Sequence, residues 1–206
     1  MARTDERGGP RTRARIAEVA SRLFLERGFD AVSVAEIARE AGVSSVTVFK
    51  HFPRKEDLFL DRQADAAEVL RAAVRERPEG VDVLASLHGT TVRLAEERAV
   101  LSGLDDRSVP FFRTVADSPA LVARARAIAS ELQGVLVDEL ERAGVGGDRG
   151  ALLAALVMAG YSTVFTTTAR QVLAGTPAAE VAEDHRARLD QFFGVLRDGF
   201  DLPQSS

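Results

Sequence analysis

Hydrophobic side chains recur every three to four positions along most of the chain, which is the spacing of amphipathic helices. The first such series comprises Ile16, Val19, Ala20, Leu23 and Phe24. We expect this helix to begin near Thr12 and to end at Gly28, because glycine adopts the left-handed backbone of a helix C-cap without a steric penalty.

A short second helix is predicted from Ser33 to Gly42. Ser33 and Glu36 have the spacing of a capping box, in which each side chain accepts a hydrogen bond from the other residue's backbone N–H. Ile37 and Ala38 then follow at positions that can face a first helix. The glycine at position 42 is expected to end the helix and open a turn.

A third short helix is predicted from about Ser45 to His51, and Pro53 stops it. We interpret Val46, Val48 and Phe49 as its apolar positions. Its exposed face is predicted to be small and polar, made of Ser44, Ser45, Thr47, Lys50 and His51.

A fourth helix is expected to open at Lys55, because Glu56 and Asp57 would favour the positive end of a helix macrodipole. Further helices are predicted near residues 81–99, 110–117, 119–143, 149–174 and 177–200. Since no stretch alternates polar and apolar residues as a strand does, we expect an all-α fold.

The composition is that of an ordinary globular protein. Among 206 residues, 46% are hydrophobic and 28% are charged, and the absence of cysteine excludes disulfides and thiolate metal sites. The N-terminus has no apolar signal segment, and the longest apolar run, 151–157, is far shorter than the roughly 20 residues of a membrane span. We therefore expect a cytoplasmic protein with no membrane partner.

Charge is distributed unevenly along the chain. Residues 1–55 carry eleven basic and seven acidic side chains, a net +4, whereas residues 56–206 carry sixteen and twenty-four, a net −8. A basic segment points to a nucleic-acid or membrane-surface partner, although chance fluctuation produces similar differences. The arginines before the first helix either reach into a minor groove or form a solvated terminus.

The second and third helices have the pattern of a helix-turn-helix. Gly42 permits the tight turn between them, and Val43 can fill the angle that they make. In such a unit the later helix lies in the DNA major groove while the earlier one crosses the backbone. Small hydroxyl and cationic side chains on the later helix can bond base edges or phosphates.

Residues 12–59 closely resemble the DNA-binding domain of TetR-family transcriptional regulators. The matching runs are 16–29, 33–44 and 47–58, in order and without gaps. At Phe49 the family usually has a tyrosine that contacts a phosphate, and a phenylalanine cannot donate that bond. Lys55 matches a family lysine that meets the DNA backbone. The predicted DNA-contacting residues are Ser33, Ser44, Ser45, Thr47, Phe49, Lys50, His51 and Lys55.

The resemblance implies a domain plan. We predict a flexible basic arm over residues 1–11, a helix-turn-helix domain over 12–56 and a helical effector-binding and dimerisation domain over 57–202. It also implies a homodimer formed through the helices near 149–174 and 177–200. The twofold symmetry of such a dimer matches a palindromic operator in double-stranded DNA.

The second domain is predicted to bind a small molecule. Residues 111–126 resemble a segment of TetR-family regulators with acyl-CoA-regulator-like C-terminal domains, which implies a small apolar or acyl-CoA-like effector. The helix near 149–174 is apolar on nearly every face in its first half, as suits a core or an oligomer interface. The predicted pocket comprises Phe112, Gln133, Met158, Tyr161 and Phe165, with ordinary core packing as the alternative for Met158 and Phe165.

No catalytic chemistry is predicted. His51, His88 and His185 lack metal-ligand spacing, and neither a nucleophile elbow nor a glycine-rich phosphate loop occurs, so no metal or cofactor is expected. We therefore predict a ligand-responsive homodimeric regulator, a repressor released from its operator by a small apolar effector. The alternative is a DNA-binding regulator or architectural protein without an effector.

Overall fold

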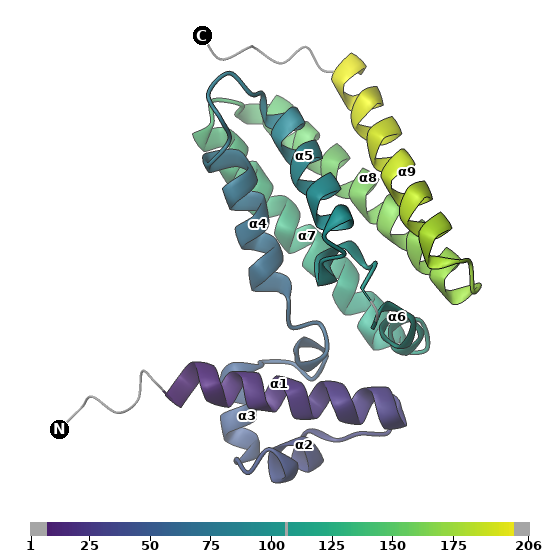
Figure 1. Ribbon diagram of the computed structural model, residues 1–206. Helices are drawn as coiled ribbons and strands as arrows, with labels where there is room; N and C mark the ends of the chain where they lie inside the picture. Colours follow the sequence, from purple (N-terminus) through teal and green to yellow (C-terminus); the bar gives the residue numbers. More distant parts are fainter. Residues whose placement is uncertain (1–7, 106, 200–206) are drawn as a thin grey trace, which may run out of the picture. The chain divides into compact units, whose positions relative to one another are not determined.

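A computed structural model describes residues 8–105 and 107–199, and all regular structure in these ranges is helical (Figure 1). The α-helices are α1 (Gly8–Arg27), α2 (Val34–Glu40), α3 (Ser45–His51), α4 (Gln63–Arg75), α5 (Val83–Glu96), α6 (Ser108–Ala116), α7 (Pro119–Arg142), α8 (Gly147–Leu173) and α9 (Ala178–Gly199). Two short 3-10 helices, η1 (Glu56–Leu58) and η2 (Val100–Ser102), lie in connecting segments. The predicted all-α fold class is confirmed.

The chain divides into two compact units. The N-terminal unit contains the residues up to Asp61 together with Arg113–Ala125. The bundle unit contains Arg62–Phe112 and the residues from Arg126 onward. Helices α6 and α7 therefore contribute residues to both units.

The N-terminal unit is built on α1, which contacts α2, α3 and η1. Its fully buried large side chains include Ile16, Phe24, Ile37, Phe52, Leu58 and Leu121. The ring of Phe24 lies 4.9 Å from that of Phe29 and meets the edge of Phe59 at 5.8 Å. The start of α7 belongs to this unit, because the Arg124 guanidinium donates to the Asp57 carboxylate at 2.7 Å.

Two predicted helix boundaries differ from the structure. Helix α1 begins at Gly8 instead of near Thr12, since Pro10 is tolerated in a first turn, where its missing N–H is not needed. The helix expected to open at Lys55 is instead η1 followed, after a turn, by α4 from Gln63. The apolar residues of that stretch belong to different cores, Leu58 to the N-terminal unit and Val74 to the bundle unit, so one continuous helix does not form.

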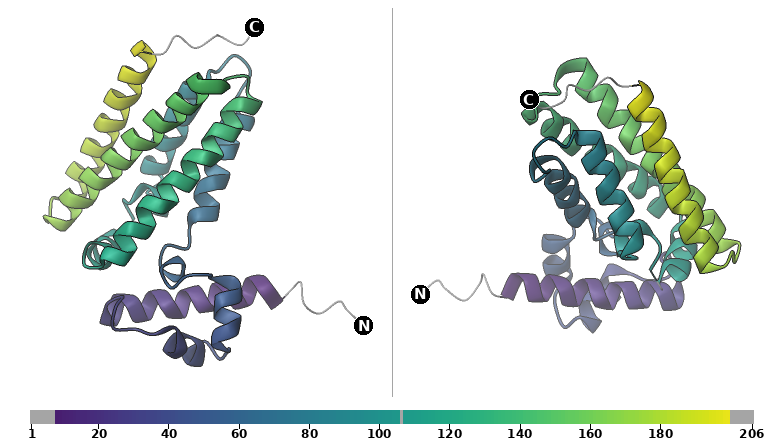
Figure 2. Two further views of the ribbon diagram at one scale, coloured as in Figure 1. Left: turned by 180° about the vertical axis from the view of Figure 1, so that it is seen from behind. Right: turned by 45° about the horizontal axis from the view of Figure 1, so that its top comes forward.

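The bundle unit packs long helices side by side around a main hydrophobic core, and a smaller cluster contains Ala95, Leu104 and Val181. Helix α9 contacts both α5 and α8, and α4 contacts α5 (Figure 2). The fully buried members of this core include Leu84, Leu136, Leu140, Leu153, Leu189 and Phe193. Helices α8 and α9 approach each other closely at Gly160, where a Cβ would overlap the ring of Phe192.

An ion pair with a buried carboxylate joins α4 to α7 in the same unit. Arg75 donates two hydrogen bonds to the carboxylate of Glu139, at 2.7 and 2.6 Å, and Arg142 donates a third at 2.6 Å. The Glu139 side chain is only 1% exposed, and the hydrogen bond from Arg75 lowers the pKa of that carboxyl. Two arginines that remain more than half exposed donate to this carboxylate, so its buried charge is compensated from the surface.

Helix α8 is long and apolar enough to pass a membrane-span test of length and composition, with a window of mean hydropathy 1.5. A core helix of a folded bundle passes the same test. In this chain the helix packs along α9 and carries Leu153, Ala154 and Val157 in the hydrophobic core, which accounts for its composition.

Candidate nucleic-acid interface and effector region

The turn between α2 and α3 has the geometry that the sequence predicts. Gly42 adopts a φ of +64°, and the N–H of Val43 donates back to the carbonyl of Ala38 at 2.9 Å. This is the bond that closes a Schellman-type helix end. An L side chain at position 42 would be strained by its backbone conformation, so the glycine is required by the turn.

The serine hydroxyls of the site first serve the helix ends. Ser33 and Glu36 form the predicted capping box, with the Ser33 N–H donating to the carboxylate at 2.9 Å and the Glu36 N–H to the hydroxyl at 3.2 Å. Ser44 caps α3 by accepting from the Thr47 N–H at 3.1 Å. Its hydroxyl also lies 2.9 Å from that of Thr47. Both serines thus orient the two helices, and each hydroxyl keeps acceptor capacity for a further partner.

The outward face of α3 differs from the expected one. Val48 is fully buried, whereas Val46 is 79% exposed and Phe49 is 49% exposed. Of the three apolar positions of this helix, only Val48 therefore packs inward, and Val46 and Phe49 face outward on the side expected to be small and polar. In this seven-residue helix one buried side chain, that of Val48, packs against the rest of the unit. Apolar character alone does not predict which side of so short a helix is buried. Lys50 shares the exposed face with them, while Ser45 and His51 are partly covered.

The acidic side chains of α2 are neutralised by α1. Arg27 pairs with Glu36, and Arg22 pairs with Glu40. Hydrogen bonds from the Ser33 backbone and hydroxyl, and then from Arg27, hold the pKa of Glu36 at about 2. The two acids of α2 are therefore each compensated by an arginine of α1.

Three cations near this face remain unpaired. Arg39, Lys50 and Arg54 are exposed, and none forms an ion pair with another residue that the structure describes. With the acids of α2 already paired, the surface around α3 presents uncompensated positive charge. Such a surface attracts a polyanion.

Lys55 is partly buried and is already bonded within the N-terminal unit, unlike an exposed lysine whose ammonium is fully available to a phosphate. Its Nζ donates to the carbonyl of Phe29 at 2.7 Å and lies 4.2 Å above the centre of the Phe29 ring. Partial burial lowers the pKa of this lysine, opposed by the charge of Asp30. An ammonium carries three N–H donors, so the bond to Phe29 leaves donors for a phosphate, and its contact with DNA stays a prediction.

The predicted arm lies partly outside the described residues. Positions 1–7 are among those not described, and residues 8–11 form the first turn of α1. Further along that helix, the guanidinium of Arg13 lies 4.5 Å above the Phe52 ring and donates to the Asp61 carbonyl at 3.3 Å. That arginine holds α1 against the segment that follows α3.

Three of the five residues predicted to line an effector pocket lie together. Phe112 meets the edge of Phe165 at 5.3 Å, and Tyr161 lies 6.4 Å from Phe165. The Tyr161 hydroxyl donates to the Leu101 carbonyl at 3.0 Å, and burial raises the pKa of this tyrosine to about 12. Gly103 lies so close that a Cβ there would be 2.7 Å from the Phe112 ring. These aromatic side chains pack as a closed cluster.

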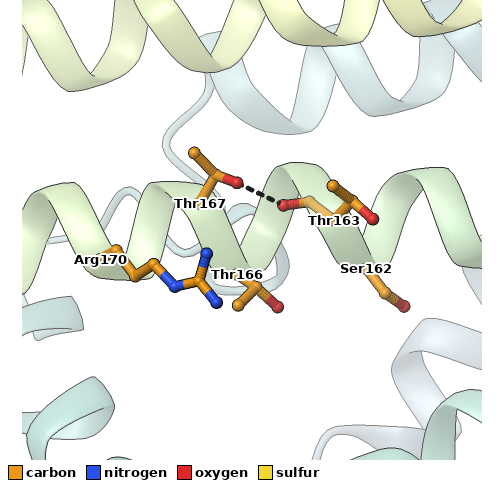
Figure 3. A pocket seen from close by; sticks show the side chains of 5 residues that line it. All are labelled: Ser162, Thr163, Thr166, Thr167 and Arg170. Carbon is orange, nitrogen blue, oxygen red and sulfur yellow. Dashed lines mark hydrogen bonds between the residues drawn. The ribbon is translucent and has the colours of Figure 1, made fainter.

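The other two predicted pocket residues lie elsewhere. Met158 is buried in the main core of the bundle unit, and Gln133 is half-buried on α7. A shallow depression does occur on α8, lined by Ser162, Thr163, Thr166, Thr167 and Arg170 (Figure 3). It includes none of the predicted residues. Its Thr163 and Thr167 hydroxyls donate to the helix carbonyls four residues earlier, both at 2.9 Å.

His185 is a buried polar residue whose burial is not predicted by the sequence pattern. Its Nδ1 lies 2.8 Å from the Thr168 hydroxyl, and its Nε2 is buried without a hydrogen-bond partner among the described residues. Burial, followed by the charge of Arg188, lowers the pKa of this histidine to about 4. A lone histidine on an otherwise charged helix carries no signal of burial before the helices are packed.

These features define a class of protein. Two short capped helices joined by a glycine turn, with unpaired cations around the second helix, form a helix-turn-helix of the DNA-binding type. Residues 16–61 match the sequence model of bacterial regulatory proteins of the tetR family.

Relatives support the same grouping. The chain is 30% identical over 129 residues to the HTH-type transcriptional regulator TcmR of Streptomyces glaucescens, a match that covers 61% of this chain and 57% of TcmR. In fold it is similar to NalD of Pseudomonas aeruginosa, with a TM-score of 0.58, 20% identity and coverage of 90% and 96% of the two chains. It is also similar to SmeT, with a TM-score of 0.60, 16% identity and coverage of 94% and 96%.

These comparisons support a TetR-family transcriptional regulator, and the match to the family's sequence model covers residues 16–61. Regulators of this family are not enzymes. The matched region spans a little over half the length of TcmR. The structural neighbours share the same fold, which is an N-terminal helix-turn-helix followed by a helical C-terminal domain.

Proposed function

We propose that the protein binds duplex DNA with α3 in the major groove and regulates transcription. The observation that carries this proposal is the outward face of α3, where Lys50 lies among unpaired exposed cations while the neighbouring acids are compensated. Phosphate contacts from such cations supply affinity, and side chains on the helix select the sequence. The predicted contacts remain Ser33, Ser44, Ser45, Thr47, Phe49, Lys50, His51 and Lys55.

The proposed working form is a homodimer that pairs α8 and α9 with their copies. Leu152 and Leu156 on α8 are 55% and 37% exposed, and Val195 on α9 is 66% exposed. Large exposed side chains on two adjacent long helices favour a helical interface. A twofold dimer would present two α3 helices to a palindromic operator.

The proposed regulation is repression relieved by a small apolar effector. NalD is described as the secondary repressor of a multidrug efflux pump, and the SmeT structure is a complex with triclosan. For this chain, an effector would act by binding more tightly to the state that cannot engage the operator. Linkage then requires that operator and effector weaken each other's binding equally.

A second function is favoured by one observation. Phe112, Phe165 and Gly103 pack too closely to leave space between them, which suits a regulator without a small-molecule effector. In that case the bundle unit would serve dimerisation alone. The two proposals share the DNA-binding site and differ only in ligand response. In either case we expect the protein to act in the cytoplasm.

The deciding experiment is selection of random duplex DNA on the purified protein, followed by sequencing. An enriched palindrome would support a sequence-specific dimeric regulator, and release of that duplex by apolar compounds such as triclosan or an acyl-CoA would support the effector. Retention of DNA at physiological salt without an enriched sequence would favour an architectural role. No retention at any salt concentration would overturn the proposal.

A further inference from the structure

Helix α3 exposes two apolar side chains that do not contribute to the hydrophobic core. Val46 is 79% exposed and Phe49 is 49% exposed, and they lie one helical turn apart on the same side. The core beneath them is already occupied by Val48 and Phe52, which are 0% and 1% exposed. Phe49 also makes no ring contact with another described aromatic residue. Folding therefore leaves both side chains available to a partner.

The charge around this apolar pair selects the kind of partner. Lys50 is exposed beside it on the same helix, and Arg39 and Arg54 are exposed on flanking segments without ion pairs among the described residues. A purely apolar partner would bury these cations at a cost in desolvation. DNA instead offers phosphates to the cations and apolar groups on the base edges.

The apolar group that DNA presents in the major groove is the C5-methyl of thymine. A valine that projects from a helix in that groove can bury such a methyl, whereas the small hydroxyl residues Ser45 and Thr47 read hydrogen-bonding edges. Phe49 adds apolar surface one turn further along the helix. A tyrosine at this position would carry a hydroxyl that can donate a hydrogen bond to a phosphate.

We infer that Val46 is a specificity-determining residue that, together with Phe49, reads the 5-methyl group of a thymine in each operator half-site. This inference rests on the proposed DNA-binding function and assigns part of its sequence preference. The preference for thymine at that position would then arise from van der Waals contact with the methyl group and from the exclusion of water around it. Removal of the methyl group would therefore weaken binding without changing any hydrogen bond between the bases.

The test uses uracil in place of thymine in the duplex enriched by selection, because uracil pairs as thymine does and lacks only the methyl. We expect one thymine position in each half-site where this replacement weakens binding about fourfold, as burial of one methyl-sized group predicts. Val46→Ala should bind the thymine duplex more weakly and bind both duplexes almost equally. Its thermal stability should be unchanged, because Val46 is largely exposed.

Lys50→Ala is the matched control on the same face. It should weaken the thymine and uracil duplexes by the same factor, since a phosphate contact does not sense the methyl. A wild-type protein that binds both duplexes equally at every position would overturn the inference and leave the DNA-binding function standing. Retention of the full thymine preference by Val46→Ala would also overturn it. If the protein retained no duplex at all, the proposed DNA-binding function itself would be overturned.

Discussion

At the scale of single residues, His185 shows how burial changes the chemistry of an ionisable group. It is fully buried in the bundle unit and is bonded only through Nδ1 to Thr168 among the described residues. Its pKa of about 4 lies below the ordinary value of 6.5, so the unfolded chain binds a proton more readily than the folded one. The stability contributed by the neutral ring is complete above pH 6.5 and is lost as the pH falls toward 4.

We expect the free energy of unfolding to fall by up to about 3 kcal/mol across that interval from this residue alone. Chemical denaturation at a series of pH values measures it. His185→Gln does not titrate and should flatten the decline between pH 6.5 and 4, leaving only the carboxylates to act at lower pH. An unchanged decline in the variant would show that other groups cause it.

The two lysines of the helix-turn-helix unit also differ at this scale. Lys50 is exposed, whereas Lys55 donates to the Phe29 carbonyl and is partly desolvated. Lys50→Ala should lower the slope of log affinity against log salt by about one, the loss of one phosphate contact, without destabilising the fold.

Lys55→Ala should destabilise the N-terminal unit, because a bonded carbonyl loses its donor. If Lys55 also meets a phosphate, its variant should lower the salt slope by about one as well. Salt titrations of duplex binding, read beside thermal melts, separate the two effects. A destabilised Lys55 variant with an unchanged slope would restrict that lysine to a structural role.

At the scale of elements, the approach of α8 to α9 depends on one small residue. A Cβ at Gly160 would overlap the Phe192 ring, whereas a Cβ at Gly194 on α9 would meet no atom within 4 Å. Gly160→Ala should therefore lower stability by about 1–3 kcal/mol through overpacking. Gly194→Ala should raise it by about 0.5–1 kcal/mol through helix propensity. Denaturant melts of the pair measure both, and stabilisation by both substitutions would contradict the close approach.

The short elements show which local predictions hold. The capping box of Ser33 with Glu36 and the positive φ of Gly42 both occur as predicted, because caps and turns depend on residues within four positions of each other. The helix expected to begin at Lys55 does not form, because Leu58 and Val74 are buried in different cores. Whether an amphipathic pattern continues or breaks depends on the core that receives each side chain.

At the scale of the whole molecule, the proposed dimer accounts for apolar residues that one chain leaves exposed. Leu156 on α8 lies one turn before Gly160, and Val195 on α9 lies about one turn after Phe192, so the close helix contact brings them to neighbouring positions. Leu156→Asp combined with Val195→Asp should convert the dimer to a monomer in light scattering at micromolar concentration.

That double variant should also bind palindromic duplex far more weakly, because two linked α3 helices act together. Val109→Asp is the matched control, an exposed apolar residue on α6 outside the proposed interface, and it should leave the dimer intact. A double variant that remains dimeric would place the interface elsewhere.

The helical class, the helix-turn-helix and its capping residues could be predicted from the amino-acid sequence alone, because each depends on periodicity and on contacts between near neighbours. Tertiary packing sets which side of α3 faces outward and which carbonyl the Lys55 ammonium bonds. It also brings Phe112, Tyr161 and Phe165 together as a cluster. It also decided that His185 is buried and neutral at physiological pH. These properties depend on surfaces contributed by residues far apart in the chain, and only packing of the helices decides which side chains lose their contact with water.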